Sequence, residues 1–303
     1  MTQRSPKRVR LSRKDLDRHF QAFVEHLKGK RPETRGTYER ALREFVRWFS
    51  MDAEVRFTVA DIERYKRHLT IRKKLSPVSV STYLTAVRRF CEFLLSRGIL
   101  AENPARSVGG NERPRGHSRD TLTTEEVHHL LTGVETADER GKRDLAMIKL
   151  MLGCGLSEIE IIRADIRDLR TSAGQAALLV QGKGHIAKDE LVFLADDVRG
   201  ALQEYMTKRT SVTPGEPLFA SAGNRTRGER MTTRGVRDRI NACLERAGIR
   251  GIAGRRITPY SLRHTAAALL ARGGASEEEL QKRMRLGSLA TARLYLAKSR
   301  PGD

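Results

Sequence analysis

Apolar residues recur at helical spacing through the first hundred residues of the chain. Two stripes have side chains three or four residues apart: Leu16, Phe20, Phe23 and Leu27, then Tyr38, Leu42, Phe45 and Phe49. Residues at these intervals lie on one face of an α-helix, so each stripe predicts a helix with one buried side.

Two more helices are predicted before residue 100. Thr58 followed by Asp61 has the spacing of a capping box, and Ser76-Pro77 is a typical helix start. The apolar positions of these two helices are Ile62, Tyr65 and Leu69, then Val80, Leu84, Val87, Cys91 and Leu94. Gly98 fits a C-terminal cap. We therefore expect residues 1–106 to form an all-α domain of four helices.

The remainder of the chain has a mixed pattern. Thr123 with Glu126 begins one helix, and Leu145, Ile148 and Leu152 mark the next. Short apolar runs at 178–181 and 191–194 predict two strands around Gly182-Lys183-Gly184. Further helices are expected near 196–207, 233–247, 261–272, 276–285 and 291–298, with a capping box at Ser276 and Glu279. The fold class is therefore mainly α with a small β-sheet, and residues 120–303 form an α+β domain.

Residues 107–119 separate the two predicted domains. Their sequence, SVGGNERPRGHSR, combines glycine, proline and polar residues without periodicity, which is typical of a linker. Arg113 and Arg115 in this linker are candidates to contact a nucleic acid that the chain crosses.

Composition adds a strong positive charge. The chain has 303 residues and a formal net charge of +21, which favours a polyanionic partner. The alternative, a merely soluble surface, needs far less charge. Residues 1–120 hold 28 Lys and Arg against 14 Asp and Glu, so the first domain is expected to contribute much of the binding.

Other classes of protein are disfavoured. No run of about 18 apolar residues predicts a membrane span, and the basic N-terminus lacks the apolar stretch of a secretory signal. The three cysteines, Cys91, Cys154 and Cys243, are scattered and have no metal-ligand spacing. We expect a cytoplasmic protein with reduced, buried cysteines, no disulfide framework, no metal site and no membrane partner.

A basic surface is predicted on the third and fourth helices. Acids are sparse between residues 64 and 91, where the candidate phosphate contacts are Arg64, Lys66, Arg67, Arg72, Lys73, Lys74, Arg88 and Arg89. The alternative is a solvated helix face, which usually mixes both signs of charge at i+4 spacing.

Three residues in the second domain are candidates for chemistry. Arg263 lies among small and apolar residues, where a guanidinium needs a partner, either a phosphate or a carboxylate of the protein itself. Lys183, at a hairpin tip, can bind phosphate or donate a proton, although such a turn is often only a turn. Tyr295 can act as a nucleophile or simply pack.

The order of these segments resembles the tyrosine recombinase family, which includes the phage integrases. The resemblance covers nearly the whole chain. It rests on 76–108, with the Asn103-Pro104 exit after a long helix, on LVQGKGHIAKDELVFL, on PLFAS followed by ITPYSLRHTAAALLARGGA, and on LGSLATARLY. The first domain would then be the family's SAM-like core-binding domain and the second its catalytic domain.

The resemblance implies a specific reaction. In this family a tyrosine attacks a DNA phosphodiester and forms a 3′-phosphotyrosyl link, which a 5′-hydroxyl later reverses. Carried over to this chain, Tyr295 is the nucleophile, Arg263 a phosphate clamp and Lys183 the general acid. The chemistry combines covalent catalysis with positioned charge and needs no cofactor.

Three positions depart from the family pattern. Ser157 follows Gly-Leu where the family's first arginine is expected, and a hydroxyl cannot neutralise a phosphate. Arg163 is a poor substitute because it lies roughly 9 Å further along a helix. Tyr260 and Ser288 stand where two histidines are expected, and the span from Ser288 to Tyr295 is about two residues short.

Three functions remain open from the sequence. The first is a DNA-binding relative with weak or lost strand cleavage, acting as an accessory beside an intact recombinase or assembling with itself on double-stranded DNA. The second is a working recombinase in which another arginine supplies the missing charge: Arg255, Arg256, Arg283 or Arg285. The third is a basic protein that binds RNA or another partner.

Overall fold

The computed structural model describes residues 10–30, 32–51, 55–110, 120–182, 185–223 and 225–299. The chain divides into two compact units, Met1–Arg115 and Gly116–Asp303. Each unit has its own apolar core. No helix of the described ranges is both long enough and apolar enough to cross a bilayer.

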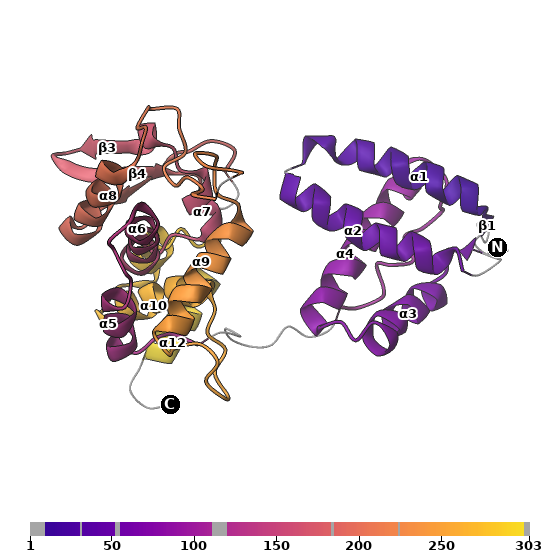
Figure 1. Cartoon of the computed structure of the whole chain (residues 1–303). Coiled ribbons are helices and arrows are strands. Elements are labelled where there is room, and N and C mark those ends of the chain that lie inside the picture. The colour runs from indigo at the N-terminus through magenta and orange to yellow at the C-terminus, as the bar shows by residue number, and fades with distance from the viewer. Residues whose placement is uncertain are drawn as a thin grey trace. The chain divides into compact units, whose positions relative to one another are not determined.

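Within its described residues the first unit has four α-helices, as the apolar stripes predict (Figure 1). In chain order its elements are β1 (Arg10–Leu11), α1 (Arg13–His26), η1 (Leu27–Gly29), α2 (Pro32–Phe49), β2 (Val55–Arg56), α3 (Val59–Arg67), the π-helical turn η2 (His68–Arg72) and α4 (Pro77–Ser96). A two-residue antiparallel ladder between β1 and β2 adds to the helices. Phe23, Phe45, Tyr65 and Phe90 are among the buried aromatic side chains of the core.

The predicted helix ends of this unit are confirmed. Thr58 and Asp61 form a reciprocal capping box at α3. Ser76 accepts a hydrogen bond from the backbone N–H of Ser79, and Pro77 is the first residue of α4. Gly98, just beyond α4, has a φ of +68°, the left-handed conformation that favours glycine.

The second unit packs helices around one buried central helix. Its elements are α5 (Thr124–Thr132), α6 (Glu139–Gly153), α7 (Glu158–Arg163), η3 (Ile166–Asp168), β3 (Leu169–Ser172), β4 (Gln175–Val180), β5 (Glu190–Phe193), α8 (Asp196–Lys208), α9 (Thr233–Arg246), α10 (Pro259–Arg272), α11 (Glu277–Arg283) and α12 (Leu289–Ser299). Helix α6 contacts both α8 and α10, and its apolar side chains, such as Met147 and Leu150, are fully buried.

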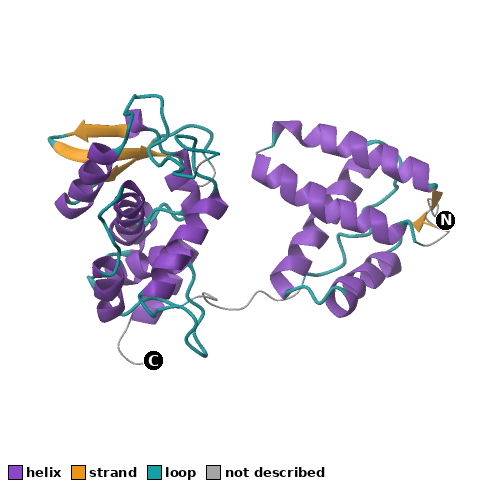
Figure 2. Ribbon diagram, viewed as in Figure 1, coloured by secondary structure: helices purple, strands orange, loops and turns teal. Residues whose placement is uncertain are grey.

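The sheet is antiparallel, with the order β3-β4-β5, and lies beside α8 (Figure 2). The two predicted strands correspond to β4 and β5, in which Leu178 pairs with Val192. The apolar pattern missed β3 because three of its four residues are polar and none is buried. The two predicted strands are joined by residues 181–189, which is longer than a tight Gly-Lys-Gly turn.

Two further expectations are corrected. The helix expected near 261–272 begins two residues earlier, at Pro259, so Arg263 lies in its second turn rather than at its start. Cys91 and Cys243 are buried, but Cys154 is half-buried at the end of α6. The capping boxes predicted at Thr123 and Ser276 are confirmed.

A small second cluster joins the last three helices. Helix α12 packs against α10 and α11, and the side chains in contact include Ala267, Leu280, Met284, Ala292 and Tyr295. Small alanines on α10 let α12 approach closely. This packing buries Tyr295, which is only 5% exposed.

Candidate active site and nucleic-acid interface

Arg263 is buried and bound to the protein itself. Its Nη1 donates to Oε2 of Glu160 at 3.1 Å and also to the carbonyl of Gly155. Its Nη2 donates to the carbonyl of Met284. Of the two partners that the sequence allows for Arg263, a phosphate or a carboxylate of the protein, the structure therefore contains the carboxylate. Three segments of the second unit meet at this guanidinium.

Glu160 is the centre of this cluster. Its Oε1 accepts from Nε of Arg285 at 2.5 Å, and its Oε2 accepts from Arg263 and from the backbone N–H and hydroxyl of Ser157. Burial raises the pKa of Glu160, but the charges of Arg285 and Arg263 outweigh burial and hold that pKa below its usual value. The carboxylate therefore stays ionised between two guanidinium groups.

Ser157 has a structural task in α7. It is the N-cap residue of this helix and forms a capping box with Glu160. Its hydroxyl donates to Glu160 at 2.7 Å, so the only hydrogen of that hydroxyl is already used. Position 157 therefore stabilises the start of a helix and brings no positive charge to the site.

Tyr295 lies against a histidine of α10. Its hydroxyl is 2.5 Å from Nδ1 of His264, and the His264 ring also packs edge-on against Tyr260, with centroids 4.8 Å apart. Burial raises the pKa of Tyr295, and the neighbouring Tyr260 adds to this effect. The hydroxyl is thus kept neutral, which makes it a weak nucleophile in this state.

The other predicted positions of this site lie elsewhere or are not described. Ser288 is exposed just before α12, where its hydroxyl lies 3.2 Å from that of Thr291. Lys183 lies outside the described residues. Its neighbours Gly182 and His185 line a cavity of about 430 Å³ together with Arg285.

Sequence reasoning missed two residues of this cluster and underrated a third. Glu160 follows Ser157 at capping-box spacing, and His264 is four residues after Tyr260, so both relationships could have been read from the chain. Arg285 is one of the four arginines that the sequence offers as a source of the missing charge. Of those four, Arg255 pairs with Glu126 instead, and Arg256 and Arg283 are exposed.

Five of the predicted phosphate contacts have partners within the first unit. Arg64 pairs with Asp61, Lys73 with Glu44, and Arg89 with Glu92. Lys66 donates to the carbonyl of Gly109. Arg88 donates to the carbonyls of Ala105 and Val108 and so holds the segment after α4 in place. Glu44, the partner of Lys73, lies on α2 and outside the acid-poor stretch 64–91, so the sequence of that stretch does not show this ion pair.

The remaining candidates are open to solvent or are not described. Arg67, Arg72 and Lys74 are exposed, and Lys74 has a left-handed backbone with a φ of +49°. Arg113 and Arg115 lie outside the described residues.

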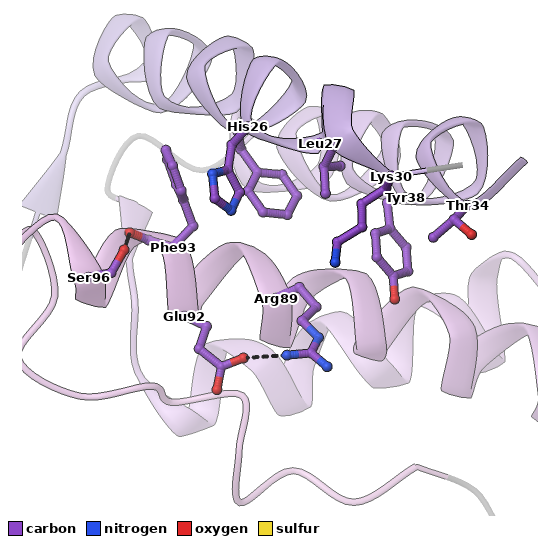
Figure 3. Close-up of a pocket in the computed structure, with 10 residues that line it drawn as sticks. His26, Leu27, Lys30, Thr34, Tyr38, Arg89, Glu92, Phe93 and Ser96 are labelled. Atoms are coloured by element: carbon purple, nitrogen blue, oxygen red, sulfur yellow. Dashed lines mark hydrogen bonds and ion pairs between the residues drawn. The ribbon is translucent and has the colours of Figure 1, made fainter. Parts of the chain in front are cut away.

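Arg89 lines a cavity of about 520 Å³ between α4 and the α1–α2 segment. Figure 3 shows Lys30, Tyr38 and Arg89 at this pocket, with the guanidinium of Arg89 joined to Glu92. Phe23 and Phe93 supply its apolar part. Cationic and aromatic side chains therefore share this face of the first unit.

Comparison with protein families covers most of the chain. Residues 120–300 match the phage integrase family, and residues 16–100 match the phage integrase N-terminal SAM-like domain. The tyrosine recombinase XerC of Azotobacter vinelandii is 30% identical, over 93% of this chain and 90% of its own length. XerC of Pelobacter propionicus is 29% identical over 92% and 90%. XerD of Caulobacter vibrioides is 32% identical over 77% and 75%.

Solved structures have the same fold. The recombinase XerH bound to a palindromic difH substrate has a TM-score of 0.73 at 18% identity, over 95% of this chain and 82% of its own. A lambda integrase dimer bound to a COC′ core site has a TM-score of 0.73 at 15% identity, over 97% and 80%. The SAM-like helical unit followed by a catalytic-type α+β unit is thereby confirmed.

Proposed function

The chain belongs to the phage integrase family, and we propose that it binds double-stranded DNA in site-specific recombination or integration with weak or lost strand cleavage. The similarity to XerC and XerD supports recombination as the process. XerH and lambda integrase are described in complexes with DNA, which supports duplex DNA as the partner. In this proposal the domain formed by residues 1–106 binds the duplex and the linker 107–119 crosses it. The domain formed by residues 120–303 contacts the DNA phosphate at the candidate site.

The observation that carries the proposal is the position of Ser157. Its hydroxyl is used in a helix cap, so one of the family's two arginine charges is missing there. Loss of one well-placed group that stabilises charge in a transition state costs on the order of 10²–10³ in rate. Tyr295 adds to this loss because its buried hydroxyl has a raised pKa.

The same changes leave DNA binding intact. Arg67, Arg72 and Lys74 are exposed on the first unit and are the strongest candidates for phosphate contact. The net charge of +21 supplies long-range attraction to a polyanion. The protein would then serve as an accessory subunit, beside an intact recombinase or with further copies of itself on DNA.

The second candidate function is an active recombinase. The hydrogen bond between Tyr295 and His264 favours it, because a histidine in that place could accept the tyrosine proton during attack on a phosphate. In that case Lys183 would protonate the leaving oxygen and Arg263 would turn toward the phosphate.

A single experiment separates the two functions. Duplexes that the full-length protein retains from a random-sequence pool are nicked to make suicide substrates, and denaturing gels then detect a covalent protein–DNA adduct. We expect salt-sensitive binding and little or no adduct. Rapid adduct formation that is abolished in Tyr295→Phe would establish the active recombinase instead. Equal binding to duplex RNA of the same sequence, or binding insensitive to salt, would contradict both.

A further inference from the structure

Arg285 has an unusual backbone for an arginine. Its φ is +50°, the left-handed region in which a side chain crowds the backbone. Such a conformation persists where the surrounding contacts hold it. The side chain is 4% exposed and is bound at every nitrogen: Nε to Glu160, Nη1 to the carbonyl of Arg283, and Nη2 to the carbonyls of Cys154 and Gly155.

These contacts bring its charge close to position 157. The carbonyls of Cys154 and Gly155 precede Ser157 by three and two residues, and lie 3.3 and 3.0 Å from Nη2 of Arg285. Glu160, another partner of Arg285, also accepts a hydrogen bond from the Ser157 hydroxyl. The turn between α11 and α12 thus places the Arg285 guanidinium beside the loop before α7. Position 157, where the family resemblance expects an arginine, lies at the end of that loop.

The charges in this cluster do not balance. Arg263 and Arg285 both pair with Glu160, and neither pairs with another carboxylate among the described residues. Each guanidinium carries one positive charge and Glu160 one negative charge, so one positive charge is in excess in a buried place. An unbalanced buried charge is unfavourable, and a phosphodiester carries the single negative charge that would balance it.

Arg285 also lines a cavity. About 430 Å³ of space is lined by Arg285, by Gly182 and His185 of the β4–β5 loop, and by residues of α11 and the turn after it. Glu190 and Glu278 also line the cavity, so its walls as a whole do not select anions. Arg285 and Lys282 contribute positive charge to the same lining.

We propose that Arg285 is a DNA phosphate-binding residue, which supplies from the α11–α12 turn the positive charge that position 157 lacks. The proposal rests on the proposed DNA binding and assigns one of its contacts. It explains how a chain with Ser157 still presents two guanidinium groups at one site, Arg263 and Arg285. The contact concerns phosphate binding alone. Position 157, where the resemblance expects the catalytic arginine, still carries no charge, so weak cleavage remains the expected outcome.

The test uses the full-length protein and a fluorescent DNA duplex over a series of salt concentrations. Each phosphate contact contributes about 0.9 to the slope of log affinity against log salt concentration. We expect Arg285→Gln to bind about tenfold more weakly and to lower the slope by about that amount. Arg143→Gln is the matched control, because Arg143 is equally buried and bound to Asp144 and the Ala220 carbonyl; its slope should not change.

Two further variants separate charge from structure. Ser157→Arg combined with Arg285→Gln should recover the slope, because charge returns to the same place from the other segment; failure to recover it would overturn the proposal. Arg285→Lys keeps the charge and should keep the slope, so its loss in a folded protein would also overturn the proposal. Circular dichroism establishes that each variant is folded. Wild-type slope and affinity in folded Arg285→Gln would refute the role of Arg285, whereas salt-insensitive binding by the wild type would refute the proposed function itself.

Discussion

The hydroxyl of Tyr295 on α12 lies 2.5 Å from Nδ1 of His264 on α10. Both side chains are about 95% buried, so the pair ties the last helix of the chain to the helix that carries Arg263. Burial raises the pKa of the Tyr295 hydroxyl, which therefore stays neutral and away from solvent. For Tyr295 to attack a phosphate, α12 would have to move or the proton would have to pass to His264.

The raised pKa of Tyr295 predicts a loss of stability at alkaline pH. Burial, the largest cause, raises the pKa above the ordinary value of 10.0, so the folded state holds this proton more tightly than the unfolded state. The resulting stability is present below about pH 10 and declines as the pH rises beyond it. We expect Tyr295→Phe to make that decline shallower by up to about 1.4 kcal/mol per pH unit.

Urea unfolding between about pH 8 and pH 11 measures this effect. Tyr65 and Tyr205 also have pKa values raised by burial, so part of the decline should remain in the variant. An alkaline decline identical in wild type and Tyr295→Phe would contradict the inferred burial of this hydroxyl.

Restoring the expected residues should restore cleavage if only the chemistry was lost. We predict that Ser157→Arg with Tyr260→His and Ser288→His raises adduct formation on a suicide substrate by at least about 10²-fold, the cost of one missing charge-stabilising group. Loss of the Ser157 cap should lower stability by about 1 kcal/mol. The matched control adds Tyr295→Phe, which should remove the adduct. Continued absence of cleavage would point to the short segment between Ser288 and Tyr295.

We predict that some arginines of the basic surface of the first unit bind DNA and that others only stabilise the fold. Arg67 and Arg72 are exposed, so their joint replacement by alanine should lower the salt slope of DNA binding by about 1.8, at 0.9 for each contact. The stability of that variant should stay within about 0.5 kcal/mol of wild type.

Arg88→Ala is the matched comparison for those surface variants. Arg88 binds the carbonyls of Ala105 and Val108, so its removal should destabilise the protein by about 1–3 kcal/mol. Thermal unfolding and fluorescence anisotropy distinguish the two kinds of arginine. An unchanged salt slope in the double variant would show that these arginines are a solvated face.

Gly155 should be intolerant of a side chain. Its φ is +61°, and a Cβ there would come within 2.6 Å of the Met284 side chain. The methionine end can move aside, but the left-handed backbone costs about 1–2 kcal/mol for any other residue. Gly155→Ala should therefore lower the free energy of unfolding by about that amount in urea titrations. Gly200→Ala is the control, since Gly200 lies in α8 with open space around it, and it should not destabilise.

The sequence predicted the helices because their signals are local. Helical spacing at Leu16 and Phe20 and the capping boxes at Thr58 and Thr123 depend on residues a few positions apart. Strand β3 escaped prediction because its residues are mostly polar and, among the described strands, it pairs with β4 alone. A strand stabilised by its neighbour rather than by its own pattern leaves little trace in the chain.

For the candidate site, too, some residues can be predicted from the sequence and others are found only in the tertiary structure. Through the family resemblance, the sequence predicts Arg263, Lys183 and Tyr295 as site residues and Ser157 as a departure from the expected arginine. Only the tertiary structure shows that Glu160 joins Arg263 to Arg285, two residues 103 and 125 positions away from it, and that Tyr295 meets His264. Hydrogen bonds and charges act through space, so their balance at a site is decided by which segments the fold brings together.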